Sequence, residues 1–522
     1  MEENIRIGKT VIETLTQGMY EDARFIFREY VQNAADAIDK AVAKNILSDR
    51  KKGEIFIEID RDNKRITFED NGTGIEQKNV FTVLGNIALS EKDRTKDKGF
   101  RGIGRLGGLG YCENLIFETS FAGEPNKSIM IWNAFDLRQK LFDKNVKDDA
   151  SEIVKSIITI KNEHEKADNH YFKIILDGID NDDLLDIEDV KEYLSMVVPV
   201  QYPAQFFYKT DIYKYAKQEH FEIDEYCIYL NEESITKPYN TALYEENSRN
   251  SDYKKYDEIV EIKFFSFDNE HQEKLAWGWY GISRFEKQIP KRPNYYRGIR
   301  LRKGNIQIGD EQTLLNRRIL REERANGYFL GEIFCLHPDL IPNSRRDYFN
   351  ENNVLKSLEK ALRELFHGTL HDLYYTASNL RGAYKKISKA SELKNEIAEK
   401  EKIGFIGDEK EKLIEGLEVA RNEATEAIKK IERTEKTLET TENSALSNVV
   451  QHIKKEYENK AEEQSIFQPI PEPKKIKYRT DKLSKLTKEQ RKFLNMIYVI
   501  IKRTLIPQQA EELIQKIEEE LM

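Results

Sequence analysis

The spacing of hydrophobic and polar positions along this chain of 522 residues divides it into regions. Up to about residue 203, helix-like segments alternate with strand-like ones, and most glycine-rich motifs lie here. Residues 204 to about 350 contain strand-like runs such as 225–230 (EYCIYL) and 259–265 (IVEIKFF), mixed with basic turns. From residue 351 the pattern is helical. We therefore expect one domain over 1–203, a second over 204–350 and a helical region beyond them.

The helical region contains a long stretch, residues 408–464, that lacks proline, holds Gly416 as its one glycine and is rich in Glu, Lys and Ala. This composition predicts a long helix within a helical or coiled-coil region over 351–465. A heptad-like seam runs along it, although small and polar residues fill more than half of the seam. Packing on its own domain and a coiled-coil contact, within or between chains, both stay open. The seam consists of Leu413, Leu417, Ala420, Ala424, Ala427, Ile431, Thr434, Leu438, Thr441 and Ala445.

The C-terminal end has the pattern of a helical hairpin behind a linker. Proline-rich residues 468–473 (QPIPEP) predict a linker over 466–480. Thr487 and Gln490 form a capping-box pattern, and Pro507 suits the first position of a second helix. Because an apolar hairpin behind a linker buries itself poorly, we expect residues 481–522 to form a homodimer, with docking on its own body as the alternative. The predicted apolar faces carry Phe493, Leu494, Ile497, Ile501 and Leu505 on the first helix and Ala510, Leu513, Ile514, Ile517 and Leu521 on the second.

Composition narrows the class of protein. The net charge is −9, from 84 basic and 93 acidic residues, which argues against nucleic-acid binding by bulk charge and leaves a local basic patch possible. The three cysteines, Cys112, Cys227 and Cys335, are widely spaced and form no CxxC pair, so we expect neither a disulfide framework nor a zinc site. A reducing cytoplasm fits this pattern. The N-terminus does not look like a signal peptide, and no long apolar run predicts a membrane span.

Candidate chemistry begins in residues 25–40 (FIFREYVQNAADAIDK), whose apolar spacing predicts a buried helix. Glu29, Asn33 and Asp36 lie at i, i+4 and i+7 of that helix, so they share one stripe. Polar groups on a mostly apolar helix need partners, because leaving each one buried and unpaired costs about 1–3 kcal/mol. The stripe therefore indicates a polar site, and a solvated helix face is the alternative.

Two glycine-rich motifs follow the helix. Residues 68–75 (FEDNGTGI) come after a strand-like pair, with Asp70 at a strand end and with Gly72 and Gly74 allowing close approach of a ligand to the backbone. Residues 99–110 (GFRGIGRLGGLG) contain six glycines, and such loops expose backbone N–H groups that bind phosphate oxygens. Each motif alone is weak evidence. Together, and in this order, they are specific.

In this order the motifs resemble the GHKL superfamily of gyrase, heat-shock chaperone, histidine kinase and mismatch-repair ATPases, and most of all the ninety-kilodalton heat-shock chaperones. The likeness includes residues 7–15 (IGKTVIETL) ahead of the buried helix, 84–90 (LGNIALS) and 103–107 (IGRLG). It is strong over about 5–121 and continues faintly through 190–203. The resemblance implies an α+β fold: a Bergerat-type α/β sandwich ATPase domain and an α/β middle domain like ribosomal protein S5 domain 2, ahead of the helical region.

The resemblance also implies roles for single residues. Glu29 matches the general base that activates water, Asn33 the ligand of Mg²⁺, and Asp70 the carboxylate that accepts a hydrogen bond from the adenine amino group. Asp36 and Thr119 resemble helpers around the base and its water. The remaining residues expected to contact ATP are Gly72, Gly74, Leu84, Gly102, Ile103, Gly104, Arg105, Leu106 and Gly107. Residues 86–100 would form a lid, for which a surface loop is the alternative.

In relatives of this kind, the middle domain supplies a cation to the γ-phosphate. Residues 329–349 (FLGEIFCLHPDLIPNSRRDYF) are similar to the chaperone segment that carries this arginine. Asn343 with Arg345 or Arg346 are the candidates, and we favour Arg346 because it precedes an aspartate. A cation here would stabilise charge that develops on the transferred phosphoryl group. An exposed Arg–Arg turn without this role is the alternative.

The resemblance leaves several functions open. An ATP-driven, chaperone-like clamp would hydrolyse ATP with Mg²⁺, close its lid and dimerise, on a client that the sequence does not reveal. The alternative is an ATPase switch in a DNA-linked or antiphage defence complex, and a basic cluster with interleaved tyrosines over 291–303 would suit nucleic acid. A histidine kinase is disfavoured because the first histidine, His164, follows the ATPase motifs. A slow ATP-binding scaffold would not need Glu29.

Overall fold

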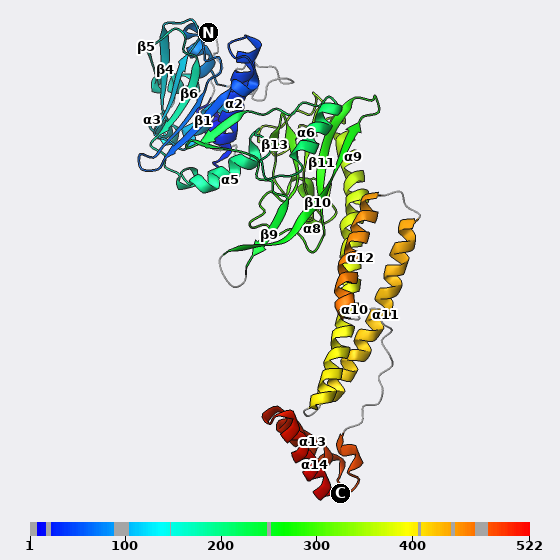
Figure 1. The fold of residues 1–522 in the computed structure, drawn as a ribbon. Coiled ribbons are helices and arrows are strands. Elements are labelled where there is room, and N and C mark those ends of the chain that lie inside the picture. The colour runs from blue at the N-terminus through cyan, green and yellow to red at the C-terminus, as the bar shows by residue number, and fades with distance from the viewer. Residues whose placement is uncertain are drawn as a thin grey trace. The chain divides into compact units, whose positions relative to one another are not determined.

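The computed structural model describes residues 8–16, 22–87, 104–146, 148–247, 252–405, 409–439, 444–464 and 479–522. The chain divides into two compact units, each taken by itself here (Figure 1). The first consists of Met1–Ser283 with Gln288–His367, and the second of Arg284–Lys287 with Gly368–Met522. The described residues thus combine a mixed α/β unit with a largely helical one.

An eight-stranded sheet forms the N-terminal part of the first unit. Its order is β5 (Ile158–His164), β4 (Asn126–Asn133), β3 (Asn114–Ser120), β6 (Tyr171–Asp177), β2 (Arg65–Asp70), β1 (Glu54–Asp60), β7 (Cys227–Leu230) and β8 (Glu233–Ser234). Apolar residues alternate along β1 and β2, so that one face of the sheet is buried. The core on that face includes apolar residues of α2 (Phe25–Ala43), as its apolar spacing predicts. The described helices α1 (Thr10–Thr16), α3 (Ala134–Phe142), α4 (Ala150–Ile157) and α5 (Ile187–Val197) belong to the same part of the chain.

Strand β7 joins this sheet although it lies beyond residue 203, where we expected the first domain to end. Its residues are strand-like in the sequence, but they pair in parallel with β1, from Glu54 opposite Cys227 to Ile57 opposite Leu230. Alternation of apolar residues predicts that a strand exists and which face it buries, but not its partner strand. The chain therefore returns to the first sheet after α5 and α6 (Lys209–Gln218).

A second sheet of six strands follows in the same unit. Its order is β13 (Ile306–Ile308), β12 (Gly298–Lys303), β14 (Leu330–Cys335), β11 (Lys274–Ser283), β10 (Tyr253–Asp268) and β9 (Ala242–Glu246). All six residues of β14 are buried, and it pairs in parallel with β12 and antiparallel with β11. The core beside it contains many aromatic rings, with Trp277 and Trp279 fully buried. The short helices α7 (Thr313–Asn316) and α8 (Glu323–Asn326) precede β14, and α9 (Asn353–Leu365) follows it.

The second unit contains three long helices, α10 (His371–Ile403), α11 (Glu409–Glu439) and α12 (Ser444–Gln464). The stretch expected to form one long helix is two helices here, with residues 440–443 between them outside the described part. Helix α10 packs along both of them. Seam residues Leu417, Ala420, Ala424, Ala427 and Ile431 are buried in the single chain. These positions therefore already have contacts within one copy of the protein.

The C-terminal hairpin has the helices expected from its sequence. Helix α13 (Lys488–Thr504) begins with a capping box between Thr487 and Gln490, and α14 (Pro507–Leu521) begins with proline in its first turn. Leu494, Tyr498 and Ile514 form its small core together with residues of the preceding turn. Phe493, which we placed on the same apolar face as Leu494, is 62% exposed, whereas Leu494 and Tyr498 face inward. Most of the expected linker lies outside the described residues.

Two further expectations concern the whole described chain. Cys112, Cys227 and Cys335 are all free thiols, as their spacing predicts. Among the described helices, none combines the length and apolar character needed to cross a membrane.

Candidate functional site

Helix α2 positions the three polar residues of the predicted stripe. Phe25, Phe27 and other apolar residues of α2 lie in the core, so the helix cannot turn without exposing them. Glu29 is 7% exposed and Asp36 3%, whereas Asn33 is half-buried. The predicted stripe is therefore mostly buried, and its carboxylates have to be compensated by nearby charges or hydrogen bonds.

Two guanidinium groups lie beside the Glu29 carboxylate. Arg346 Nε is 3.3 Å from Glu29 Oε1, and Arg28 Nη2 is 3.6 Å from the same oxygen. Arg28 Nη2 also donates a hydrogen bond to the Arg345 carbonyl, at 3.2 Å. Arg345 itself is exposed, whereas Arg346 is 7% exposed. The structure thus brings the side chain of Arg346 and the carbonyl of Arg345 to this part of α2.

The Arg346 loop is held in a costly backbone conformation. Arg346 has a φ of 55°, in the left-handed region that residues other than glycine rarely adopt. Its N–H donates to the Asn343 carbonyl at 3.2 Å, and its own carbonyl accepts from Gly309 N at 2.8 Å. Such a conformation costs about 1–3 kcal/mol and is concentrated at functional sites. The loop therefore presents a fixed arginine to Glu29.

The glycine-rich motif packs directly against α2. Its described part, η4 (Gly104–Gly110), is a short 3₁₀ helix in which Leu106 and Gly107 are buried. The Tyr30 hydroxyl accepts from Gly108 N at 2.9 Å and donates to the Arg105 carbonyl at 3.3 Å. A Cβ atom on Gly104 would lie 2.3 Å from Glu29 Oε2, so a side chain there would displace the Glu29 carboxylate. Residues 102 and 103, which we expected to contact ATP, lie outside the described part.

Arg105 supplies a third cation to this region. Its Nη2 donates to the Asn86 carbonyl, while its buried Nε has no hydrogen-bond partner among the residues that the structure describes. Burial lowers the pKa of Arg105 to about 10. A buried guanidinium with spare donor capacity in a glycine-rich loop is suited to an anionic ligand. Of the expected lid, only residues 86 and 87 are described.

The residues expected around adenine converge at one end of the sheet. Asp70, 3% exposed, accepts from Gly72 N at 2.9 Å, and Ile75 N donates to Thr119 Oγ1 at 2.9 Å. Gly74 has a φ of 63°, and a Cβ there would meet the Ser120 carbonyl at 1.9 Å. The motif is thus fastened to the end of β3.

Sequence reasoning missed two residues in this region. Phe172 on β6 lies opposite Asp70 on one side and opposite Thr119 on the other, so these three side chains share one face of the sheet. His170 Nδ1 is 2.9 Å from the Gly72 carbonyl. Only the strand register reveals these neighbours. Leu84, another expected contact, is buried in a π-helical turn, η3 (Phe81–Gly85).

No group of three or more His, Cys, Asp or Glu side chains that could hold a metal occurs in the described part of the chain. Mg²⁺ does not need such a group, because it keeps several waters and binds through one or two protein oxygens together with substrate phosphates. The half-buried Asn33, one turn after Glu29, offers an amide oxygen of this kind. The residues present therefore fit a magnesium ion that arrives with a nucleotide.

Comparison with known proteins shows what the N-terminal part of the chain is similar to. Residues 22–165 match the family of histidine kinase-, DNA gyrase B-, and HSP90-like ATPases. The chaperone protein HtpG of Borreliella burgdorferi is 25% identical over 381 residues, which cover 67% of this chain and 56% of that protein. HtpG of Mesorhizobium japonicum is 39% identical over 85 residues, or 15% of this chain and 14% of that one.

The similarity to these relatives covers only part of each protein. The chain spans about half the length of the curated relatives that it matches most extensively, 56% for Borreliella burgdorferi HtpG. The ATPase region of Saccharomyces cerevisiae topoisomerase II aligns with 60% of this chain and 72% of its own, at 14% identity and a TM-score of 0.33, and nothing further rests on that alignment. The resemblance predicted from the motifs is confirmed: the chain carries a GHKL-type ATPase domain and resembles the ninety-kilodalton chaperones.

Proposed function

We propose that this protein binds ATP with Mg²⁺ in its N-terminal domain and hydrolyses it, with Glu29 as the general base. One observation carries the proposal: the buried Glu29 carboxylate lies between the glycine-rich loop at Gly104 and the fixed side chain of Arg346. Phosphoryl transfer depends mostly on positioning and charge neutralisation. A base, a cation from a second sheet and a loop of backbone N–H groups are the parts that this chemistry uses.

The proposed roles follow from the surroundings of each residue. Glu29 takes a proton from the attacking water, and Arg346 stabilises negative charge on the transferred phosphoryl group. Asp70 accepts a hydrogen bond from the adenine amino group, with Gly72, Gly74 and Leu84 around the adenine. Thr119, predicted as a helper of the base and its water, instead lies beside the Asp70 motif, where its Oγ1 accepts from Ile75 N. Mg²⁺, bound through Asn33, would neutralise phosphate charge. The glycine-rich loop and Arg105 bind the phosphate oxygens, and Asp36 supports the base.

The ion pair between Glu29 and Arg346 sets a condition on this mechanism. In this arrangement the Arg346 guanidinium is engaged by the Glu29 carboxylate, with Nε 3.3 Å from Oε1. The triphosphate is a stronger attractor for Arg346, because it carries several negative charges. We therefore infer that ATP draws Arg346 towards its γ-phosphate and frees Glu29 for catalysis. Hydrolysis would then depend on the arginine supplied by the second sheet.

We further propose a chaperone-like clamp that closes its lid on ATP and dimerises through the C-terminal hairpin. The support is an apolar surface on the hairpin: Phe493, Ile500 and Ile506 are 62%, 55% and 61% exposed. Side chains of this kind gain by burial in a partner, at about 25 cal/mol per Å² of apolar surface removed from water. A second copy of the hairpin is the proposed partner.

The alternative, a switch in a DNA-linked or antiphage defence complex, loses part of its basis. Arg300 and Arg302, which we grouped in a surface basic cluster, are 5% and 0% exposed. Arg297 is paired with Glu311, its Nε lying 2.7 Å from Oε1. Fewer cations are therefore available to nucleic acid than the sequence indicated. The client or partner complex is not identified by any observation on this chain.

The proposed function is tested by Glu29→Ala. ATP binding, measured by calorimetry with Mg²⁺, should persist, because Glu29 is not among the residues proposed to contact the adenine or the ribose. Release of phosphate should fall steeply, since the proposal assigns the activation of water to Glu29. Unchanged turnover in Glu29→Ala would refute the assigned base, and a wild-type protein that fails to bind ATP would refute the function itself.

A further inference from the structure

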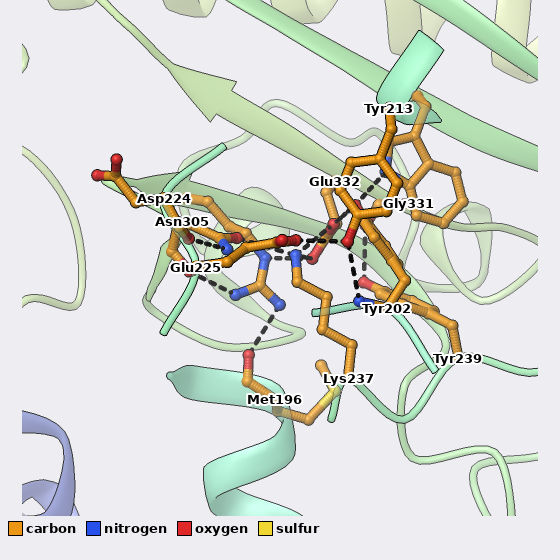
Figure 2. A network of polar contacts seen from close by, with 12 residues as sticks. Met196, Tyr202, Tyr213, Asp224, Glu225, Lys237, Tyr239, Asn305, Gly331 and Glu332 are labelled. Atoms are coloured by element: carbon orange, nitrogen blue, oxygen red, sulfur yellow. Dashed lines mark hydrogen bonds and ion pairs between the residues drawn. The ribbon is translucent and has the colours of Figure 1, made fainter. Parts of the chain in front are cut away.

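A cluster of charged side chains is buried in the second sheet and is unexplained by the proposed reaction (Figure 2). Lys237 Nζ donates to both carboxylate oxygens of Glu332, at 2.8 Å each, and to Asn305 Oδ1 at 2.9 Å. Arg302 Nε also pairs with Glu332, which accepts a further hydrogen bond from the Tyr202 hydroxyl. The side chains of Lys237, Arg302 and Glu332 are all fully buried.

Stability alone is a poor reason for this cluster. Taking each ion out of water costs several kcal/mol, and replacing such a cluster by apolar residues is often neutral or stabilising. Here two cations share one carboxylate. Burial raises the pKa of Glu332, but Arg302 and Lys237 together lower it to about 2, so the carboxylate stays charged. What such a cluster does supply is a fixed relative position of the segments that carry it, because each donor and acceptor is satisfied in one geometry.

Two hydrogen bonds from the cluster reach segments that belong with the first sheet. Arg302 Nη2 donates to the Met196 carbonyl at 2.8 Å, in the last turn of α5. Asn305 Nδ2 donates to the Asp224 carbonyl at 2.6 Å, three residues before β7. Figure 2 shows Met196 and Asp224 beside this network.

From Asp224, further polar contacts lead to α2. The Asp224 side chain accepts from Arg50 Nη1 at 2.8 Å, and Arg50 Nε donates to Asp39 Oδ1 at 2.7 Å. Tyr226 donates to the other oxygen of Asp39 at 2.8 Å. Asp39 lies on α2, the helix that carries Glu29. An unbroken series of polar contacts thus joins the cluster to the helix of the proposed base.

The other side of the cluster supports the Arg346 loop. Glu332 lies on β14, the strand that leads into residues 342–349. Arg302 lies on β12 opposite Gln307 of β13, and Gly309, just after β13, donates its N–H to the Arg346 carbonyl at 2.8 Å. The strand that precedes the Arg346 loop therefore carries Glu332, and the hydrogen bond from Gly309 to this loop comes from the end of the hairpin that carries Arg302 and Asn305.

We propose that Lys237, Arg302, Asn305 and Glu332 are positioning residues for ATP hydrolysis, which hold the Arg346 loop in register with Glu29 on α2. The inference rests on the proposed function. It predicts that loosening the cluster impairs the chemical step and leaves nucleotide binding intact, because none of the four residues belongs to the proposed ATP pocket.

Arg302→Lys tests the proposal with the charge retained. Lysine can still pair with Glu332, but one ammonium on a shorter stem cannot reproduce the hydrogen bonds of the guanidinium to both the Met196 and Asn305 carbonyls. We expect an unchanged KM and dissociation constant for ATP and a kcat lower by roughly 10- to 100-fold, the loss expected for a displacement near 1 Å. Arg297→Lys, which alters the separate pair with Glu311, is the matched control and should keep the wild-type kcat.

Asn305→Gly is the second variant, in case Arg302→Lys does not fold. Glycine tolerates the φ of 57° at this position and removes the amide that donates to the Asp224 carbonyl and accepts from Lys237 Nζ. Hydrogen exchange of amides 343–349, which needs no turnover, should accelerate in both variants and not in Arg297→Lys.

The outcomes separate the two proposals. A wild-type kcat in folded Arg302→Lys and Asn305→Gly would overturn the positioning role while leaving the ATPase intact. A kcat that falls only in proportion to the unfolded fraction, measured by thermal melting, would reduce the cluster to a structural element and also overturn it. A wild-type protein without ATP hydrolysis would overturn the proposed function, and this inference with it.

Discussion

Gly104→Ala is the substitution for which the structure gives the clearest magnitude. A methyl group at residue 104 would lie 2.3 Å from Glu29 Oε2 and 3.3 Å from Glu29 Cβ, whereas ordinary contacts begin at 3.4 Å. The carboxylate therefore has to retreat by about 1 Å, since carbon and oxygen atoms repel steeply at shorter separations. The glycine-rich backbone and the Arg346 loop stay in place, because the side chain of Glu29 is the more flexible partner.

We expect this retreat to lower kcat by about 100-fold, because a displacement of that size near the reacting atoms has such an effect. A 100-fold loss corresponds to about 2.7 kcal/mol of transition-state stabilisation. Phosphate release at saturating ATP measures kcat, and calorimetry with Mg²⁺ and ATP should show a dissociation constant close to that of the wild type.

A double-mutant cycle provides the control. In a Glu29→Ala background the carboxylate is absent, so Gly104→Ala should cause no further loss. Two results would refute the reasoning: a wild-type kcat in Gly104→Ala, or an equal loss in both backgrounds. The first would mean that Glu29 does not need its present position, and the second that Gly104 acts on the phosphates alone.

Three further expectations follow from the environments of single side chains. Arg346→Lys should lower kcat by about tenfold or more, because its buried guanidinium lies beside Glu29, whereas the exposed Arg345 should tolerate Arg345→Lys. Equal effects in a phosphate-release assay would contradict this assignment. Ellman's reagent should titrate about one thiol, Cys227, in the native protein and all three after denaturation, because burial raises the pKa of Cys112 and Cys335 to about 12. Rapid reaction of more than one thiol in the native protein would disprove this expectation. Phe493→Lys should convert a dimer to a monomer in sedimentation analysis, and a dimer that persists would remove the hairpin from the interface.

The parts of the site that lie on one element were predictable from the sequence. Apolar spacing placed α2 and its stripe of Glu29, Asn33 and Asp36, and burial of the helix agrees with that spacing. Strands β1 and β2 likewise follow from their alternation. Local periodicity carries this information because it depends only on neighbouring residues.

Contacts between distant segments were not predictable in the same way. The approach of Arg346 to Glu29, and of Arg28 to the Arg345 carbonyl, depends on how two sheets meet, which no spacing encodes. Arg302 shows the same limit. In the sequence it belongs to a run of basic residues, a pattern typical of an exposed surface. Its partner Glu332 lies 30 residues further along the chain and is revealed only by the sheet register.

The central claim, that ATP binds at the end of the first sheet, is tested most directly by calorimetric titration of Mg²⁺ and ATP into the wild-type protein and Asp70→Asn. Asparagine keeps an oxygen for the Gly72 N–H, so the turn is retained, but its amide would place a donor against the adenine amino group. We predict saturable binding at one site per chain in the wild type and none in Asp70→Asn. Equal binding by the two proteins, or no binding by the wild type, would contradict the account.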